Sequence, residues 1–150
     1  NLSHASDWAY LAISESAPVG IDVERLRVPS RHGWLNLARR FFSASEVAEL
    51  TAMPLYKQTE AFFACWTRKE AYIKLHGRGL SLPLAQFSVS AGPDSEAFLR
   101  TSEWLPGDVS HTAMQDLSTP QGYRACVAAG TESSIIVCQR QWADLVLKKF

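Results

Sequence analysis

The stretch Gly20-Ile21-Asp22-Val23-Glu24 reads as a β-strand that carries two carboxylates, at positions 22 and 24. Side chains alternate across a strand, so the two carboxylates share one face. Held side by side, they repel each other unless a cation lies between them. Such oxygen ligands suit Mg²⁺, which usually takes one or two carboxylates and adds water and substrate phosphate. Two acids at a solvated strand end would give the same pattern, so the motif alone leaves both interpretations open.

A second charged segment is predicted to lie in a helix over residues 59–76, which Gly77 would end. Its aromatic residues, Trp66 among them, follow helical spacing and would be buried in the core. The same packing would carry Glu70 and Lys74 to the edge of the core, one turn apart. They would form either an ion pair worth roughly a few tenths of a kcal/mol, or a third metal carboxylate beside a cation aimed at phosphate.

The chain resembles the Sfp-type 4′-phosphopantetheinyl transferases through five segments that occur in the order and rough spacing of that family. They are 1–4 (NLSH), 18–24 (PVGIDVE), 41–46 (FFSASE), 66–74 (WTRKEAYIK) and 77–83 (GRGLSLP). Each segment is short, and their order carries the resemblance, which spans about residues 1–90. Residues 91–150 contain no comparable motif, only strand-like segments that fit such a fold.

The resemblance implies an α+β fold in which an antiparallel sheet packs against a long helix. Family members are usually built from two similar halves with the active site between them. We therefore expect residues 1–150 to be one domain, the second half of a monomeric protein whose N-terminal half lies upstream. A short holo-acyl-carrier-protein synthase, which forms the same cleft by trimerising, is the alternative. The segment 1–4 favours the two-half type.

The resemblance also implies an activity, which is Mg²⁺-dependent transfer of 4′-phosphopantetheine from coenzyme A to a serine of an apo carrier protein. Adenosine 3′,5′-bisphosphate would be released, and Mn²⁺ could replace Mg²⁺. The family's three metal ligands fall on Asp22, Glu24 and Glu70. Ser3 and His4 match residues that bind the 3′-phosphate of coenzyme A. Asp22 and Glu70 would contact the coenzyme through the metal, and Lys74 would contact its phosphates directly.

The serine nucleophile needs a proton acceptor, and two glutamates are candidates. Glu70 could act directly or through a metal-bound water. Glu46 matches the acid after the family's Phe-Ser motif, but the spacing Ser43-x-x-Glu46 is also that of a helix capping box. Lys74 would assist catalysis by neutralising the leaving phosphate. Lys69 points about 100° away from Glu70 on the helix, so we expect it to support the structure or to face a partner.

The partner is expected to be an apo acyl or peptidyl carrier protein, because such proteins are acidic around the modified serine. The stretch 25–40 contains no acid and would steer this partner towards the metal strand. Its arginines are Arg25, Arg27, Arg31, Arg39 and Arg40. A solvated helix face is the simpler explanation. Two other functions remain open: a Mg²⁺-dependent pyrophosphate hydrolase, and a carrier-binding half-domain with no activity of its own.

Composition agrees with a single globular domain. The net charge is zero and 47% of residues are hydrophobic, so neither a nucleic-acid-binding nor a membrane surface is indicated. No apolar stretch is long enough to span a bilayer. Cys65, Cys126 and Cys138 lack metal-ligand spacing, and an odd number of apparently buried cysteines suits the reducing cytoplasm.

Local patterns predict the remaining elements. Strands over 8–14 and 19–24 would pair as a hairpin, and a helix would run over 31–40. A short helix would begin at Ser43 and end before Pro54. Further strands are predicted over 86–90, 97–101, 112–117, 123–129 and 135–139, with turns between them.

Overall fold

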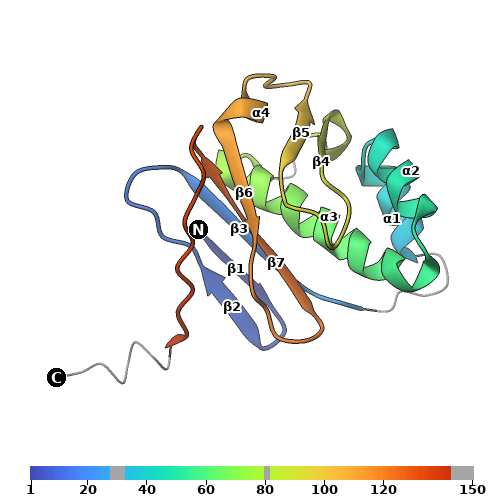
Figure 1. The fold of residues 1–150 in the computed structure, drawn as a ribbon, viewed down its shortest axis with the longest axis horizontal. Coiled ribbons are helices and arrows are strands. Elements are labelled where there is room, and N and C mark those ends of the chain that lie inside the picture. Colours follow the sequence, from blue (N-terminus) through green and yellow to red (C-terminus); the bar gives the residue numbers. More distant parts are fainter. Residues whose placement is uncertain (28–32, 80–81, 143–150) are drawn as a thin grey trace.

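The computed structural model describes residues 1–27, 33–79 and 82–142. The elements in chain order are β1 Leu2–Ala5, β2 Trp8–Leu11, β3 Val19–Arg25, α1 Gly33–Phe41, α2 Ala44–Ala52, α3 Leu55–His76, the 3-10 helix η2 Leu84–Gln86, β4 Phe87–Val89, β5 Leu99–Ser102, α4 Asp108–His111, β6 Thr112–Asp116 and β7 Tyr123–Gly130. Antiparallel strands pack against the long helix α3, which confirms the predicted α+β class (Figure 1).

The main sheet has three antiparallel strands in the order β3-β7-β6. β7 is the central strand, and it pairs along the whole length of β3, with Asp22 opposite Cys126. Two smaller antiparallel sheets accompany the main sheet, one formed by β1 and β2 and the other by β4 and β5. The strand that carries the predicted acidic residues is therefore an edge strand of the main sheet.

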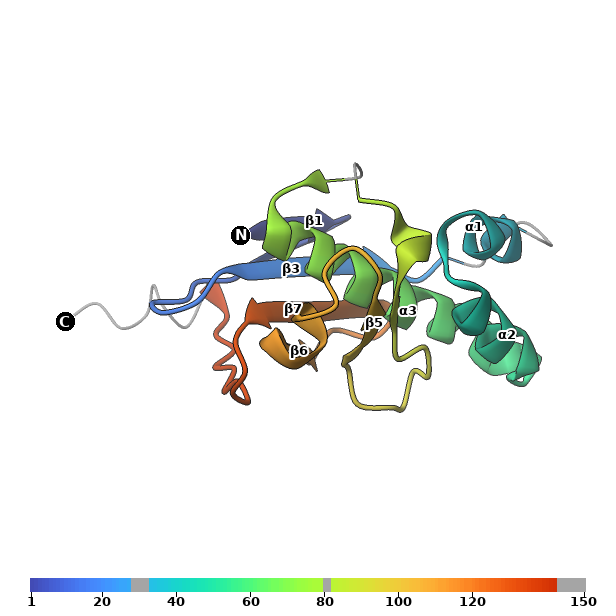
Figure 2. The same cartoon turned by 90° about the horizontal axis from the view of Figure 1, so that it is seen from above.

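Helix α3 packs against β3 and β7 on one side and contacts β4 on another. Its first turn follows Pro54, and it ends at Gly77, whose positive φ of 64° is the conformation that favours glycine at a helix end. The predicted stop at this glycine is confirmed. Helices α1 and α2 gather near the N-terminal half of α3 (Figure 2).

Aromatic side chains join these helices. The Phe62 ring of α3 stacks on Phe42 at a centroid distance of 5.2 Å and on Trp66 at 5.8 Å. Trp66 also meets the edge of Phe41, the last residue of α1, at 5.9 Å. This cluster fixes the end of α1 against the middle of α3, and it confirms the packing role expected of Trp66. Among the described residues, no helix combines the length and apolar character needed to cross a membrane.

Most of the predicted elements are confirmed, with shifted ends. The helix predicted over 31–40 is α1, described from Gly33 onwards, and Arg31 lies outside the described residues. The helix predicted from Ser43 is α2, with Ser43 as its N-cap. The thiols of Cys65 and Cys126 are buried as expected, whereas Cys138 is exposed, and all three are free.

The predicted hairpin between residues 8–14 and 19–24 is wrong. β2 pairs instead with β1, through a tight turn in which Ser6 has a φ of 50°. β3 pairs with β7, which lies about a hundred residues later in the chain. Proximity in sequence favoured the hairpin, but packing against α3 selected the distant strand.

The strand predicted over 135–139 is also wrong, because this segment runs without a β-ladder. Ile136 is 97% exposed. The amide of Gln139 instead bonds both backbone groups of Ser118, at 2.9 Å each. A period-two pattern forms a strand only where a neighbouring strand offers its backbone groups, and here a side chain holds the segment in place.

β3 and α3 approach each other most closely at Gly20. A Cβ atom built there would lie 2.1 Å from the carbonyl oxygen of Ala71 and 2.3 Å from the backbone nitrogen of Leu75. Both distances are far shorter than a van der Waals contact, and backbone atoms cannot move aside as the end of a side chain can. Glycine is therefore the residue that lets the acidic strand lie directly on α3.

We predict that Gly20→Ala lowers the free energy of unfolding by about 3 kcal/mol, because it forces the strand and the helix apart. Gly107→Ala is the matched control, since a Cβ there meets nothing within 4 Å and the φ of −64° is allowed for alanine. Urea denaturation of both variants measures the difference. A loss below about 1 kcal/mol for Gly20→Ala would contradict the close approach.

Candidate active site

The candidate site is built where β3 crosses α3. Side chains at alternate positions of a strand share a face, so Asp22 and Glu24 lie on the same side as Gly20, which is the side that touches α3. Asp22 is only 5% exposed, and Glu24 is half-buried at the end of the strand. From α3, Glu70 and Lys74 reach the same region from the edge of the core, as their spacing predicts.

One carboxylate oxygen of Asp22 accepts hydrogen bonds, and the other has no hydrogen-bond partner. Its Oδ1 accepts hydrogen bonds from Lys74 Nζ at 2.7 Å and from Ser3 Oγ at 3.0 Å. Its Oδ2 is buried and has no hydrogen-bond partner. Burial raises the pKa of Asp22, although Lys74 and Ser3 act in the opposite direction. A buried carboxylate oxygen without a partner is costly, and it is a position that a bound ligand can satisfy.

Glu70 has the same feature. Its Oε1 is buried without a hydrogen-bond partner. Burial raises the pKa of Glu70, the negative charge of Asp22 raises it further, and the charge of Glu24 adds to the effect. The nearby Lys74 ammonium acts in the opposite direction. Residues from two separate elements therefore place their negative charges close enough to disfavour one another.

Glu24 belongs to the same group. Burial raises its pKa, and the charge of Asp22 is the second cause. A hydrogen bond from the Trp66 side chain favours the ionised form, and the Arg27 guanidinium lies 3.6 Å away. Trp66 therefore has a second role besides packing. Its place beside Glu24 depends on how the strand crosses the helix, and no pattern in the sequence indicates that crossing.

The carboxylates of the site supply some of the ligands that a hard cation such as Mg²⁺ needs. Among the described residues, no three histidine, cysteine or acidic side chains are arranged to hold a metal ion as they stand. The partnerless oxygens of Asp22 and Glu70 nevertheless supply two carboxylate ligands. Two are enough for Mg²⁺ when substrate phosphate and water complete its coordination. The residues therefore fit Mg²⁺ bound together with a phosphate ligand.

Glu46 occupies a different place. It closes the capping box of α2, where its Oε2 accepts the backbone N–H of Ser43 at 2.8 Å. Both of its oxygens lie 2.8 Å from Lys69 Nζ, and Oε1 also accepts the backbone N–H of Val89. Glu46 and Lys69 are fully buried. This geometry leaves Glu46 no free oxygen for a serine proton, and it gives Lys69 a structural role in place of a partner-facing one.

Ser3 and His4 lie within β1. Because they are neighbours on a strand, they point in opposite directions. Ser3 is 7% exposed and contacts Asp22 and Lys74, whereas His4 is exposed. The resemblance assigned both side chains to the 3′-phosphate of coenzyme A. On a strand, however, the two neighbours face opposite sides. The contact of Ser3 with Asp22 joins residues 19 positions apart, and no sequence pattern indicated it.

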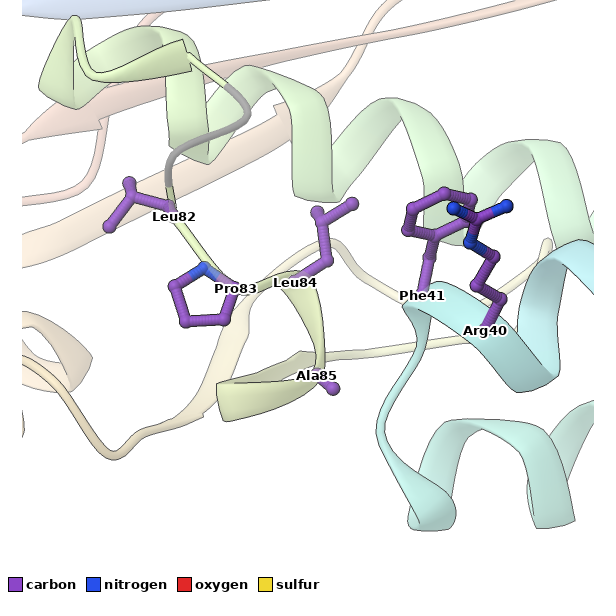
Figure 3. Close-up of a pocket in the computed structure, with 6 residues that line it drawn as sticks. All are labelled: Arg40, Phe41, Leu82, Pro83, Leu84 and Ala85. Atoms are coloured by element: carbon purple, nitrogen blue, oxygen red, sulfur yellow. The ribbon is translucent and has the colours of Figure 1, made fainter.

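A pocket of about 220 Å³ lies between the end of α1 and the segment before β4. Figure 3 shows Arg40 and Phe41 on one side of it and residues 82–85 on the other. Phe41 contacts Trp66, and Trp66 bonds Glu24. The pocket is thus linked to the acidic residues through two aromatic side chains. The arginines of the predicted docking stretch at positions 25, 27, 39 and 40 are all exposed.

We predict that Glu70→Gln stabilises the folded protein at pH 7.5 when divalent cations are removed with EDTA. A raised carboxyl pKa means that the folded state binds more protons than the unfolded state, so the free energy of unfolding falls as the pH rises above about 4.5. Glutamine carries no charge and removes this loss of stability, so the difference in unfolding free energy between the variant and the wild type should shrink towards pH 4.5. Urea denaturation at pH 7.5 and pH 4.5 measures that difference.

Glu103→Gln, at an exposed position, is the control and should show no such pH-dependent gain. If Glu70→Gln destabilised the protein equally at both pH values, Glu70 would not share a site with the other two acids.

The chain matches known proteins over most of its length. The model of the 4′-phosphopantetheinyl transferase superfamily matches residues 18–128. The chain is 36% identical to the 4′-phosphopantetheinyl transferase psf-1 of Bacillus pumilus, over 97% of this chain and 60% of that protein. It is also 36% identical to the transferase Sfp of Bacillus subtilis, over 86% and 54% respectively. The chain thus spans a little more than half the length of these two relatives.

Solved structures show the same fold. The ACPS–CoA complex of Chronobacterium ammoniagenes superposes with a TM-score of 0.55 at 17% identity, covering 77% of this chain and 96% of that one. The AcpS of Helicobacter pylori, solved with coenzyme A, superposes with a TM-score of 0.50 at 20% identity, covering 73% and 96%. The sequence match and the shared fold lead to one conclusion: this chain belongs to the 4′-phosphopantetheinyl transferase superfamily.

Proposed function

We propose that this chain carries the catalytic residues of an enzyme that transfers 4′-phosphopantetheine from coenzyme A to a serine of an apo carrier protein. The supporting observation is the pair of buried, partnerless oxygens on Asp22 and Glu70, beside the Lys74 ammonium. Carboxylates next to a cation suit a divalent metal bound to a diphosphate. The relatives' names as 4′-phosphopantetheinyl transferases point to the same reaction.

In this proposal Asp22, Glu24 and Glu70 hold Mg²⁺, and Mn²⁺ can substitute for it. When bound, the metal neutralises charge on the diphosphate and orients the leaving group. Lys74 shifts from Asp22 to the phosphates and stabilises negative charge there. His4, exposed on β1, is assigned to the 3′-phosphate of coenzyme A.

The transfer itself is a substitution at phosphorus. The serine oxygen of the carrier bonds to the phosphorus nearer the pantetheine, and the bond from that phosphorus to the bridging oxygen breaks. Adenosine 3′,5′-bisphosphate leaves with the electron pair. The serine proton passes to Glu70, directly or through water, because both oxygens of the alternative acceptor, Glu46, are already occupied by Ser43, Lys69 and Val89.

The proposal includes a second half of the protein. The chain spans 54% of the length of Sfp, and β3, which carries Asp22 and Glu24, is an edge strand of the main sheet. We place an N-terminal half of similar fold upstream, completing the coenzyme A cleft within one monomer. The free thiols of the chain agree with a reducing compartment such as the cytoplasm.

The carrier protein is proposed to dock over α1 and the pocket beside it. Arg39 and Arg40 are exposed in the last turn of α1, and Arg40 lines the pocket together with Phe41 and residues 82–85. An acidic helix with one apolar side chain would match both the charge and the apolar lining. Because the pocket is linked to Glu24 through Phe41 and Trp66, a carrier docked here would present its serine to the acidic residues.

We predict that Asp22→Ala, made in the full-length protein, lowers the rate of transfer at least about a hundredfold while the protein stays folded. The measurement is the mass gain of an apo carrier protein incubated with coenzyme A and Mg²⁺. Asp94→Ala is the control, because Asp94 is exposed and pairs with Lys57 away from the site.

Retained transfer by Asp22→Ala would remove Asp22 from the mechanism. Free phosphopantetheine with an unmodified carrier would instead identify a pyrophosphate hydrolase. Transfer by the full-length protein but not by residues 1–150 would show that this chain alone is a carrier-binding half.

For the docking surface, we predict that Arg40→Glu raises the KM for the carrier protein about tenfold and changes kcat little, because the charge steers and holds the partner. Arg140→Glu, also exposed, is the matched control on another part of the chain. Steady-state kinetics at two salt concentrations measure both variants, and the difference should shrink at high salt. An equal effect of the two substitutions would place the carrier elsewhere.

A further inference from the structure

The segment that holds Asn1 and Ser3 lies along the open edge of β3. On that edge, the backbone N–H of Ile21 donates to Asn1 Oδ1 at 3.1 Å, and the N–H of Val23 donates to Ser3 Oγ at 3.2 Å. The N–H groups of alternate strand residues point to the same edge, so these two flank Asp22. Asn1, which precedes β1, and Ser3 of β1 therefore satisfy the edge of β3 with their side chains in place of a backbone ladder.

The Ser3 hydroxyl has one hydrogen to donate and two lone pairs to accept with. Lys74 Nζ lies 2.9 Å away and can only donate, and so can the backbone N–H of Val23. These two groups use both lone pairs. The single hydroxyl hydrogen therefore goes to Asp22 Oδ1, at 3.0 Å, and the bonding capacity of Ser3 is filled.

This arrangement fixes the carboxylate of Asp22. Its Oδ1 is bound by Ser3 and Lys74, and the strand that carries it is held from the edge. The other oxygen, Oδ2, is thereby left buried and open. If Lys74 leaves Asp22 for a phosphate, the Ser3 hydroxyl still donates a side-chain hydrogen bond to the carboxylate, beside the backbone N–H of Val23.

We propose that Ser3 is a positioning residue, which orients Asp22 and Lys74 for the coenzyme diphosphate and does not bind the 3′-phosphate. The inference rests on the proposed function for its ligand. Phosphate oxygens only accept hydrogen bonds, so a phosphate could bind the Ser3 hydroxyl only by taking the hydrogen from Asp22. That exchange would take from the buried Asp22 carboxylate the hydrogen bond that fixes its orientation from the side of β1.

The experiment compares Ser3→Ala and Ser3→Thr with the wild type, all in the full-length protein. Calorimetry measures the Kd of coenzyme A and of 3′-dephospho-coenzyme A, and electron paramagnetic resonance measures Mn²⁺ binding. Ser133→Ala, at an exposed position, is the matched control.

We expect Ser3→Ala to weaken both coenzymes by a similar factor of about ten to a hundred, and to weaken Mn²⁺ binding as well. Ser3→Thr keeps the hydroxyl and should recover most of the affinity. His4→Ala, in contrast, should weaken only the coenzyme that carries the 3′-phosphate.

Two results would overturn the proposal. One is a loss on Ser3→Ala that is confined to coenzyme A, with 3′-dephospho-coenzyme A and Mn²⁺ unaffected. The other is a crystal structure of Ser3→Ala in which the Asp22 carboxylate keeps its orientation. Failure of the wild type to bind either coenzyme would contradict the proposed function instead, and the crystal structure would still decide the role of Ser3.

Discussion

The close approach of β3 to α3 at Gly20 is the constraint on which the site depends. A single added carbon at this position would meet the helix backbone at 2.1 Å. Because the strand lies directly on the helix, Asp22, two residues further on, reaches Lys74 at 2.7 Å, and Glu24, at the strand end, reaches Trp66. A side chain at position 20 would widen the gap and separate the charged groups that the two elements bring together.

Three consecutive charged residues of α3 illustrate how the helix divides its tasks. Successive side chains point about 100° apart, so each meets a different part of the fold. Arg68 is fully buried and binds both oxygens of Asp116 and the carbonyl oxygens of residues 90, 92 and 95. Lys69 is fully buried against Glu46 and the carbonyl of Phe87. Both charges are satisfied and hold α3 in place, whereas Glu70 keeps a buried oxygen without a partner.

Without a ligand, the Lys74 ammonium only partly offsets the burial and mutual repulsion of the three acidic residues. Burial raises the pKa values of Asp22, Glu24 and Glu70, and the charge of Asp22 adds to the effect on both glutamates. Lys74 offsets this repulsion as an internal counter-ion. In the proposed reaction a divalent cation would replace Lys74 at the carboxylates, and the diphosphate would accept Lys74, so the exchange conserves the pairing of charge. The same ammonium would then serve the ligand-free and the loaded states.

Local features of this protein could be read from the sequence alone. The strand period places Asp22 and Glu24 on one face, and the helix period places Glu70 and Lys74 one turn apart. Short local signals mark the helix end at Gly77 and the capping box at Ser43. The tertiary structure alone decided the rest. It paired β3 with β7 and not with β2. It also brought Ser3 to Asp22, 19 positions away in the sequence, and occupied the carboxylate of Glu46 with Lys69, 23 positions away. These outcomes depend on which distant segments pack together, and residue spacing along one element carries no information about the partner that meets it.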